Sequence, residues 1–185
     1  LTPKGIPEPM PVFERFDTNL IVEDPDWPLG LRVLEFNAVG VGCIHFMPVA
    51  NQLIADQVLP IYHTALGSTT CRMTADPRVL LQRMLETHAK AIGRKHLAIA
   101  FVERRETSSG GADEMLHVSR WFQAQGLPSV LADPRDLEVK DGELIHKDTT
   151  IDLVYRDFAL NEIISIEKHG GQVDAMKHAF RHNQV

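Results

Sequence analysis

The chain has 185 residues, of which 44% are hydrophobic and 24% are charged, a balance typical of a folded globular protein with one large domain. Its formal net charge of −6 and the absence of a basic stripe argue against nucleic acid and anionic membranes as partners. No apolar run approaches the roughly 18 residues that span a bilayer. Two cysteines, Cys43 and Cys71, without CxxC spacing argue against a disulfide framework, so we expect a cytoplasmic protein.

Two strands with polar interruptions are predicted near the N-terminus. Residues 12–24 (VFERFDTNLIVED) form the first, a loop follows at 25–30 (PDWPLG), and residues 31–39 (LRVLEFNAV) form the second. We expect these strands to pair as a β-hairpin with a long connection. Residues 51–66 have apolar side chains at helical spacing, and Pro60 is expected to kink or end that helix.

The middle of the chain alternates between helix and strand signals. Asp76 followed by Pro77 predicts the start of a helix that reaches Ile92. A buried strand at residues 96–103 and an amphipathic helix at 112–126 come next. The remaining predicted elements are a strand at 128–134, a hairpin at 137–145 around Asp141-Gly142, a strand at 150–158 and a last helix at 173–182.

This order predicts an α/β fold with a Rossmann-like, mostly parallel sheet. Residues 97–102, 129–132 and 151–155 should be strands of one sheet, with the two central helices packed on it. Of Trp121 and Phe122, only one can face the sheet fully, so one of the two should be largely buried. No GxGxxG motif follows any strand, so the sequence does not indicate a dinucleotide site.

Polar side chains occupy alternating positions on the two N-terminal strands. Glu35 and Asn37 are two residues apart and therefore point to one face, as do Arg15 and Asp17. If the strands pair, Asp17, Glu35 and Asn37 converge and offer the oxygen ligands that Mg²⁺ prefers when it binds nucleotide phosphates. Arg15 could offset phosphate charge in a transfer step. The pattern is short, and a solvated hairpin face with incidental polar residues stays an open alternative.

Two segments resemble a known family. "ERFD…LRVLEFNAV" is similar to the "R-x-D … LEYNAD" segment of the circularly permuted ATP-grasp enzymes of the glutathionylspermidine synthase type. Residues 113–158 resemble that group's helix, glycine, strand, "DL-x-V-x-DG" hairpin and "vDxVYRR" stretch. The two segments occur in the family's order and together cover about half of the chain.

The resemblance implies an activity and a role for each residue of the hairpin. Asp17, Glu35 and Asn37 would hold Mg²⁺ against the phosphates of ATP, and Arg15 would stabilise an acyl-phosphate step. The full enzyme would join a small-molecule carboxylate to an amine. The alternative is a non-catalytic α/β module that binds a small ligand or a partner protein. The sequence does not indicate an oligomeric state.

The resemblance also implies a division into three parts. Residues 1–48 would be a β-hairpin segment of a permuted ATP-grasp lobe, and residues 49–160 an α/β domain of the pre-ATP-grasp type that helps hold the substrate. Residues 161–185 would be a helical segment that continues into a missing region. The family's nucleotide-binding lysines and adenine pocket would lie there, so we expect a fragment that is inactive alone.

Three departures from the family pattern bear on these expectations. Gly40 and Gly42 stand where the family has a proline soon after "NAD", and Asp157 replaces the second arginine of "VYRR". These two departures leave the substrates open. The longer spacing between Asp17 and Glu35 makes Asp17 a weaker match than Glu35 and Asn37.

The sequence contains nine histidines, a residue type that can bind metals or contact substrates. His178 and His182 are four apart and share a helix face, but no third zinc ligand can be assigned near them. His117 lies on the helix that the family resemblance covers, and it is a candidate substrate contact.

Overall fold

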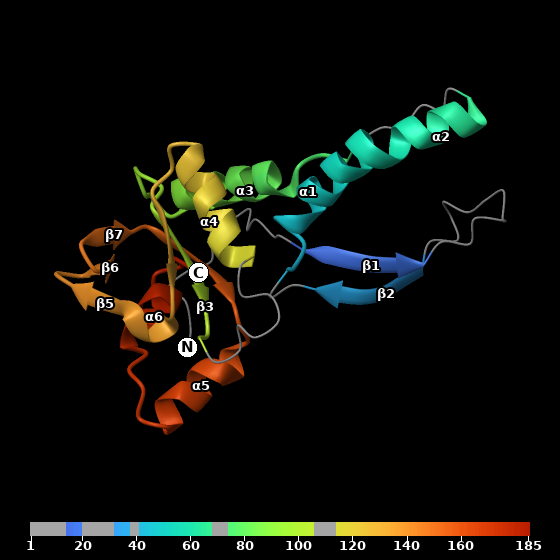
Figure 1. The fold of residues 1–185 in the computed structure, drawn as a ribbon. Coiled ribbons are helices and arrows are strands. Elements are labelled where there is room, and N and C mark those ends of the chain that lie inside the picture. The colour runs from blue at the N-terminus through green and yellow to red at the C-terminus, as the bar shows by residue number, and fades with distance from the viewer. Residues whose placement is uncertain (1–13, 20–31, 38–40, 68–73, 106–113) are drawn as a thin grey trace.

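The computed structural model describes residues 14–19, 32–37, 41–67, 74–105 and 114–185. Its body is an α/β unit with a small antiparallel sheet at one side (Figure 1). A β-hairpin and a helical arm project from the body toward the same side. The fold class predicted from the sequence, an α/β sheet preceded by a hairpin, is confirmed.

The central sheet has three parallel strands in the order β4–β3–β8. They are β3 (Ile99–Glu103), β4 (Ser129–Ala132) and β8 (Leu153–Asp157). The prediction that these three segments share one sheet is therefore confirmed. The first four residues of β3 are all buried, as expected for a central parallel strand that is covered on both faces.

The two faces of β3 contact two separate apolar clusters. Ile99 and Phe101 point into a cluster with helices α3 (Pro77–Ala91) and α4 (Glu114–Ala124). The alternate residues Ala100 and Val102 point into the second cluster. That cluster contains residues of α5 (Leu160–Lys168), α6 (Asp174–Arg181) and the antiparallel sheet. The period of two along one strand thus divides the core into two layers.

The start of α3 and the buried face of α4 agree with the predictions from the sequence. The Asp76 side chain caps α3 by accepting a hydrogen bond of 2.9 Å from the Arg78 N–H, and Pro77 is the first helical residue. On α4, Phe122 is fully buried and its ring lies 5.2 Å from that of Phe101, while Trp121 is only partly buried. The prediction that one of the two aromatic residues is buried is confirmed.

The antiparallel sheet consists of β5 (Leu137–Lys140), β6 (Glu143–His146) and β7 (Thr149–Ile151). Asp141 and Gly142 both have positive φ, 53° and 82°, as a type I′ hairpin turn requires. A short 3₁₀ helix η2 (Pro134–Asp136) precedes β5. The strand predicted at 150–158 is divided into β7 and β8.

The helical arm begins earlier than predicted and continues past Pro60. It begins with α1 (Phe46–Leu53), passes through a π-helical turn η1 (Ile54–Val58) and continues as α2 (Leu59–Leu66). Pro60 does not end the helix. Proline lacks an N–H and crowds the carbonyl four residues earlier, and the wider π turn before it accommodates both effects.

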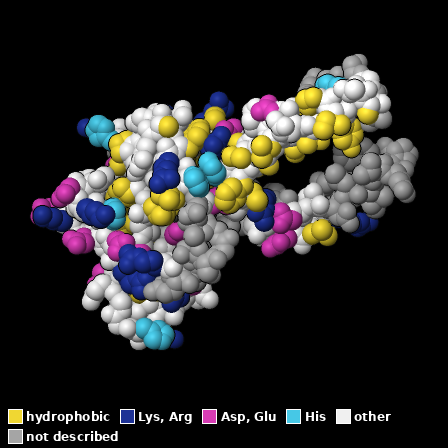
Figure 2. Space-filling view, in the orientation of Figure 1, with side chains coloured by type: hydrophobic (Ala, Val, Ile, Leu, Met, Phe, Trp, Pro, Cys, Tyr) yellow, Lys and Arg dark blue, Asp and Glu magenta, His cyan; other side chains and the backbone are white. Residues whose placement is uncertain are grey.

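The arm carries large apolar side chains that are exposed to solvent. Figure 2 shows hydrophobic side chains along this arm. Among the described residues, no helix is long and apolar enough to cross a membrane. Exposed apolar patches of this kind mark interaction surfaces. We call this set the apolar arm: Phe46, Val49, Leu53, Ile54, Val58, Ile61 and Tyr62.

Candidate functional site

The two strands of the hairpin bring the predicted site residues together. β1 (Arg15–Asn19) pairs antiparallel with β2 (Arg32–Asn37), with Asp17 opposite Glu35 and Arg15 opposite Asn37. Opposite residues share a face, so all four side chains lie on the same side of the hairpin. The predicted pairing and convergence are confirmed. The predicted strand ends beyond β1 and β2 lie outside the described residues.

The Asp17 carboxylate accepts hydrogen bonds from two other side chains on this face. Its two oxygens accept hydrogen bonds from Arg15 Nε at 2.8 Å and Arg15 Nη2 at 3.1 Å, and Asn37 Nδ2 donates to it at 3.3 Å. The hydrogen bond from Arg15 is the main cause that holds the pKa of Asp17 below its usual value. The same contact raises the pKa of Arg15. Asp17 is therefore ionised at neutral pH.

The chemistry of the donor set fits Mg²⁺. Glu35 and Asp17 stand directly opposite each other, and like charges at such positions repel unless a cation lies near them. Asp17 already accepts three hydrogen bonds, whereas within the described residues no N–H donates to the Glu35 carboxylate. The Asn37 amide donates through its nitrogen, which leaves its oxygen to bind a metal. The assignment of Glu35, Asn37 and Asp17 as metal ligands stays a prediction.

These residues would not complete a metal site by themselves. Within the part of the chain that the structure describes, no group of three or more His, Cys, Asp or Glu residues could hold a metal ion. The hairpin offers two carboxylates and one carboxamide. Mg²⁺ is often bound by one or two carboxylates together with water and substrate phosphates, so a partial site of this kind is consistent with a nucleotide-dependent role.

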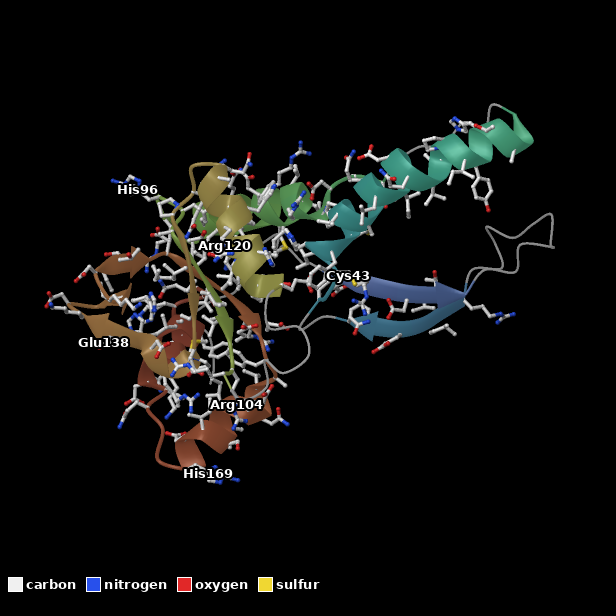
Figure 3. The ribbon with its side chains drawn as sticks, viewed as in Figure 1. Cys43, His96, Arg104, Arg120, Glu138 and His169 are labelled. Carbon is white, nitrogen blue, oxygen red and sulfur yellow. The ribbon has the colours of Figure 1, made fainter. Side chains whose placement is uncertain are left out.

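The hairpin meets the body through Glu114, a residue that sequence reasoning missed. Glu114 is the first residue of α4 and is buried. Its carboxylate accepts hydrogen bonds from the backbone N–H groups of Cys43, at 3.0 Å, and His45, at 2.9 Å. The sequence shows only an acidic residue in a helix first turn, because both partners are about 70 positions away. Figure 3 places Cys43 at this junction.

The carboxyl edge of the parallel sheet lies near this junction. β3 ends at Glu103 and β8 at Asp157, and these two residues are paired in the register. Ligands of open α/β sheets bind outside the carboxyl ends of the strands. Burial first, and then the negative charges of Glu114 and Glu162, raise the pKa of Asp157. Asp157 thus lies in buried and acidic surroundings at this edge.

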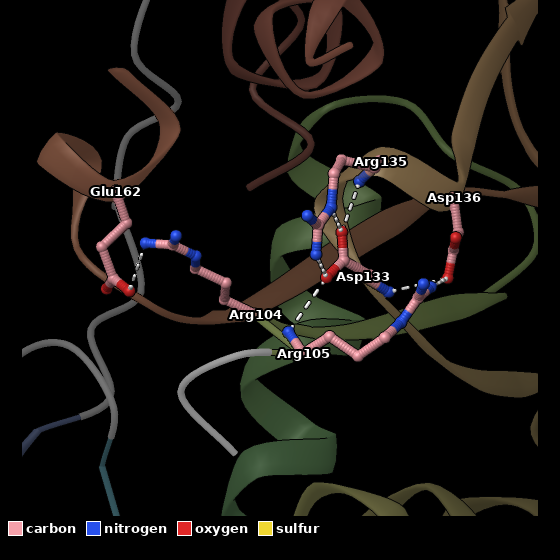
Figure 4. A network of polar contacts seen from close by, with 6 residues as sticks. All are labelled: Arg104, Arg105, Asp133, Arg135, Asp136 and Glu162. Atoms are coloured by element: carbon pink, nitrogen blue, oxygen red, sulfur yellow. Dashed lines mark hydrogen bonds and ion pairs between the residues drawn. The ribbon is translucent and has the colours of Figure 1, made fainter. Parts of the chain in front are cut away.

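An arginine–aspartate network fixes the ends of β3 and β4 beside each other (Figure 4). Asp133, directly after β4, accepts from the Arg105 N–H at 2.9 Å and from the Arg135 side chain at 2.6 and 2.7 Å. Arg105 also donates to Asp136 at 2.5 Å. On the other side of the edge, Arg104 lies 4.0 Å from Glu162. This network joins the two strand ends that border the edge.

Two histidine pairs are stacked. The rings of His45 and His117 lie 4.7 Å apart at 15°, which places the candidate substrate contact His117 at the junction. Burial, and then His117 itself, lower the pKa of His45. The rings of His178 and His182 lie 4.0 Å apart on α6, as their spacing predicted. No third metal ligand accompanies them among the described residues, so the zinc hypothesis gains no support.

Comparison with known proteins identifies a similar fold but no family. No family model matches the chain, and no curated protein matches its sequence. Among solved structures, the fold resembles part of the glutathione synthetase-like effector GSS30 from Globodera pallida in its apo form, with a TM-score of 0.54 and 11% identity. The match covers 95% of this chain and 44% of that protein, so the chain spans less than half of its length.

Proposed function

We propose that this chain carries the Mg²⁺-holding hairpin and the substrate-side α/β domain of an ATP-dependent carboxylate–amine ligase of the circularly permuted ATP-grasp type. The observation that carries the proposal is the convergence of Asp17, Glu35 and Asn37 on one face of the hairpin, beside Arg15. The likeness of the fold to part of a glutathione synthetase-like protein supports the same class.

The proposed reaction has two steps. A carboxylate oxygen of one substrate attacks the γ-phosphorus of ATP, the bond from that phosphorus to the bridging oxygen breaks, and ADP leaves. The amine nitrogen of the second substrate then attacks the acyl carbon, phosphate leaves, and the nitrogen loses a proton as the amide forms. Mg²⁺, when bound, neutralises the phosphate oxygens during the transfer.

Each hairpin residue has a role in this scheme. Glu35, the Asn37 amide oxygen and Asp17 would hold the metal, and Arg15 beside them would bind the transferred phosphoryl group. Arg15 suits this task because a guanidinium matches phosphate geometry with two hydrogen bonds. The carboxyl edge of the sheet beside Asp157 borders the space for the carboxylate and amine substrates.

The chain by itself should bind nucleotide weakly. It contains neither the lysines nor the apolar adenine slot of such enzymes in recognisable form. Mg²⁺ releases its water reluctantly and depends on other ligands to complete its shell. We therefore expect the 185-residue chain to bind Mg·ATP no tighter than about millimolar, or about −4 kcal/mol. Micromolar binding in titration calorimetry would contradict this view of the nucleotide site.

Mn²⁺ provides the direct test of the hairpin, because it prefers the same oxygen ligands as Mg²⁺. The free Mn²⁺ signal is followed by electron paramagnetic resonance as protein is added. Wild type and a Glu138→Gln control should bind weakly and equally, because Glu138 is an exposed residue of β5 far from Cys43 in Figure 3. Glu35→Gln should abolish this binding with an unchanged circular dichroism spectrum. Equal binding by Glu35→Gln and wild type would refute the proposal.

The apolar arm favours a second candidate, a non-catalytic module that binds a partner protein. Ile61 is 69% exposed and Leu53 is 58% exposed on the arm. In this case Glu substitutions at these two residues would abolish partner capture, and Glu35→Gln would leave it intact. In any preparation that forms amides from ATP, the ligase proposal instead requires that Glu35→Ala abolish this activity while the fold is retained.

A further inference from the structure

The carboxylate of Glu114 is buried, and both of its oxygens accept hydrogen bonds. Glu114 is 8% exposed. One of its carboxylate oxygens accepts a hydrogen bond from the backbone N–H of Cys43, and the other accepts one from the backbone N–H of His45, both in the segment 41–45. A buried charge of this kind persists only when hydrogen bonds replace its hydration. The helix N-terminus on which Glu114 lies also favours a negative charge. Glu114 therefore fixes the backbone of this segment to the body.

The same segment contacts the hairpin on its other side. Arg15 Nη1 donates to the Gly42 carbonyl at 3.2 Å, while the rest of its guanidinium holds Asp17. A Cβ added at Gly42 would lie 3.5 Å from Arg15 Nη1 and 3.7 Å from Glu114 Oε2. The two charged side chains thus approach one peptide group from different parts of the fold. A chain of hydrogen bonds runs from Glu114 through Gly42 to Arg15 and Asp17.

The backbone conformation of Cys43 shows that the segment needs this support. Cys43 has a φ of 69°, a left-handed conformation that is uncommon for a residue other than glycine. Such a conformation persists when surrounding contacts impose it. The hydrogen bond from the Cys43 N–H to Glu114 is one such contact. Without it, the segment is free to relax, and the Gly42 carbonyl would leave its place beside Arg15.

We infer that Glu114 is a positioning residue that sets the direction of the Arg15 guanidinium. Glu114 acts from α4 through the backbone of Gly42 and is not itself a ligand of metal or substrate. The inference rests on the proposed function in one respect, which is that Arg15 serves the phosphoryl transfer. Its structural content, the dependence of Arg15 on Glu114, can be measured without any assay of activity.

The test follows the Nη1–H proton that Arg15 donates to the Gly42 carbonyl, by ¹⁵N nuclear magnetic resonance, with its signal assigned by its loss in Arg15→Lys. In wild type and in Glu138→Gln this proton should exchange slowly with water at a distinct shift. In Glu114→Gln, a substitution of nearly equal shape, exchange should become about tenfold faster, as the loss of one hydrogen bond allows. Glu114→Ala should have at least this effect. Amide signals elsewhere in the body should stay unchanged, which a general loosening of the fold would not produce.

The Mn²⁺ titration on the same samples separates this inference from the proposed function. If wild type binds Mn²⁺ and the Arg15 signal is the same in Glu114→Gln as in wild type, the positioning role is wrong and the metal site stands. If wild type binds no Mn²⁺ but the Arg15 proton exchanges faster with water in Glu114→Gln, the positioning of Arg15 is confirmed and the metal site is wrong.

Discussion

Replacing Asp133 by asparagine should lower the free energy of unfolding by about 2–3 kcal/mol at neutral pH. The Asp133 side chain is 2% exposed and accepts four hydrogen bonds, three from Arg135 and one from the Arg105 backbone (Figure 4). Loss of one member of a buried charged pair costs about 3–5 kcal/mol. Asparagine keeps one accepting oxygen, and the Arg135 side chain is 31% exposed and can turn to water, so the expected loss is smaller.

The pH dependence of this loss follows from the pKa of Asp133. Burial alone would raise that pKa, but the hydrogen bonds from the Arg135 side chain and from the two backbone N–H groups together hold it below its usual value. The folded pKa is therefore below the unfolded value of about 3.9. The contribution of the carboxylate is present above about pH 4 and is lost as the pH falls through the folded pKa. The difference between wild type and Asp133→Asn should shrink accordingly.

Urea denaturation monitored by circular dichroism between pH 7 and pH 3 measures this difference. In thermal unfolding, the loss corresponds to a fall in Tm of roughly 4–12 °C for a chain of this size. The exposed Asp148 provides the control, and Asp148→Asn should change stability by less than about 0.5 kcal/mol. A difference for Asp133→Asn that stays constant down to pH 3, or that is no larger than the control at pH 7, would show that the network does not act as a buried charged pair.

Two further substitutions test the core and the titration of a buried histidine. Phe122→Ala should cost about 3–5 kcal/mol in urea denaturation because Phe122 is fully buried, whereas Ile61→Ala on the exposed apolar arm should cost less than about 0.5 kcal/mol. Burial, and then Lys147, lower the pKa of His146, so its contribution is complete above the unfolded pKa of about 6.5 and is lost as the pH falls through the folded value. His146→Gln should therefore reduce the decline in stability between pH 7 and pH 5, and His96→Gln, at an exposed loop position, should leave it unchanged.

Features with a local cause could be predicted from the sequence. Asp76 followed by Pro77 favours the start of a helix. Asp141 followed by Gly142 favours a tight hairpin turn. The shared face of Asp17 and Glu35 follows from the period of two, once the strands pair with these residues opposite each other. Each of these predictions required information from only a few neighbouring residues.

Features with a distant cause could not be predicted in the same way. Asp152 ends β7 because its carboxylate accepts from the Ala98 N–H at 2.9 Å and its own N–H donates to the Ala98 carbonyl at 2.8 Å. Gln184 is fully buried, and its carbonyl accepts from the Val154 N–H at 2.6 Å. A polar residue in the penultimate position of the sequence gives no signal of burial. The three-part division of the chain stays a prediction.

The same distinction applies to the candidate site. The hairpin carboxylates could be found from their spacing, but the role of Glu114 depends on partners about 70 residues away and has no pattern in the sequence. The surroundings of Asp157 likewise come from a distance, because burial and the charges of Glu114 and Glu162 raise its pKa. Spacing along a strand could thus be predicted from the sequence, whereas contacts between distant segments could not.

The opposing carboxylates of Asp17 and Glu35 help to separate the two proposed functions. A surface that only binds a partner protein gains nothing from two like charges directly across a strand pair, which destabilise the hairpin unless a cation offsets them. Arg15 offsets part of this repulsion, because it contacts Asp17 and also interacts electrostatically with Glu35. Under the proposed function, a metal ion held by Glu35 and Asn37 would offset the rest of it. On this reasoning Glu35→Gln should lose Mn²⁺ binding and, without metal, unfold at a higher urea concentration than wild type. An incidental polar face would bind no Mn²⁺ in wild type, so the loss of Mn²⁺ binding is the change that separates the two readings.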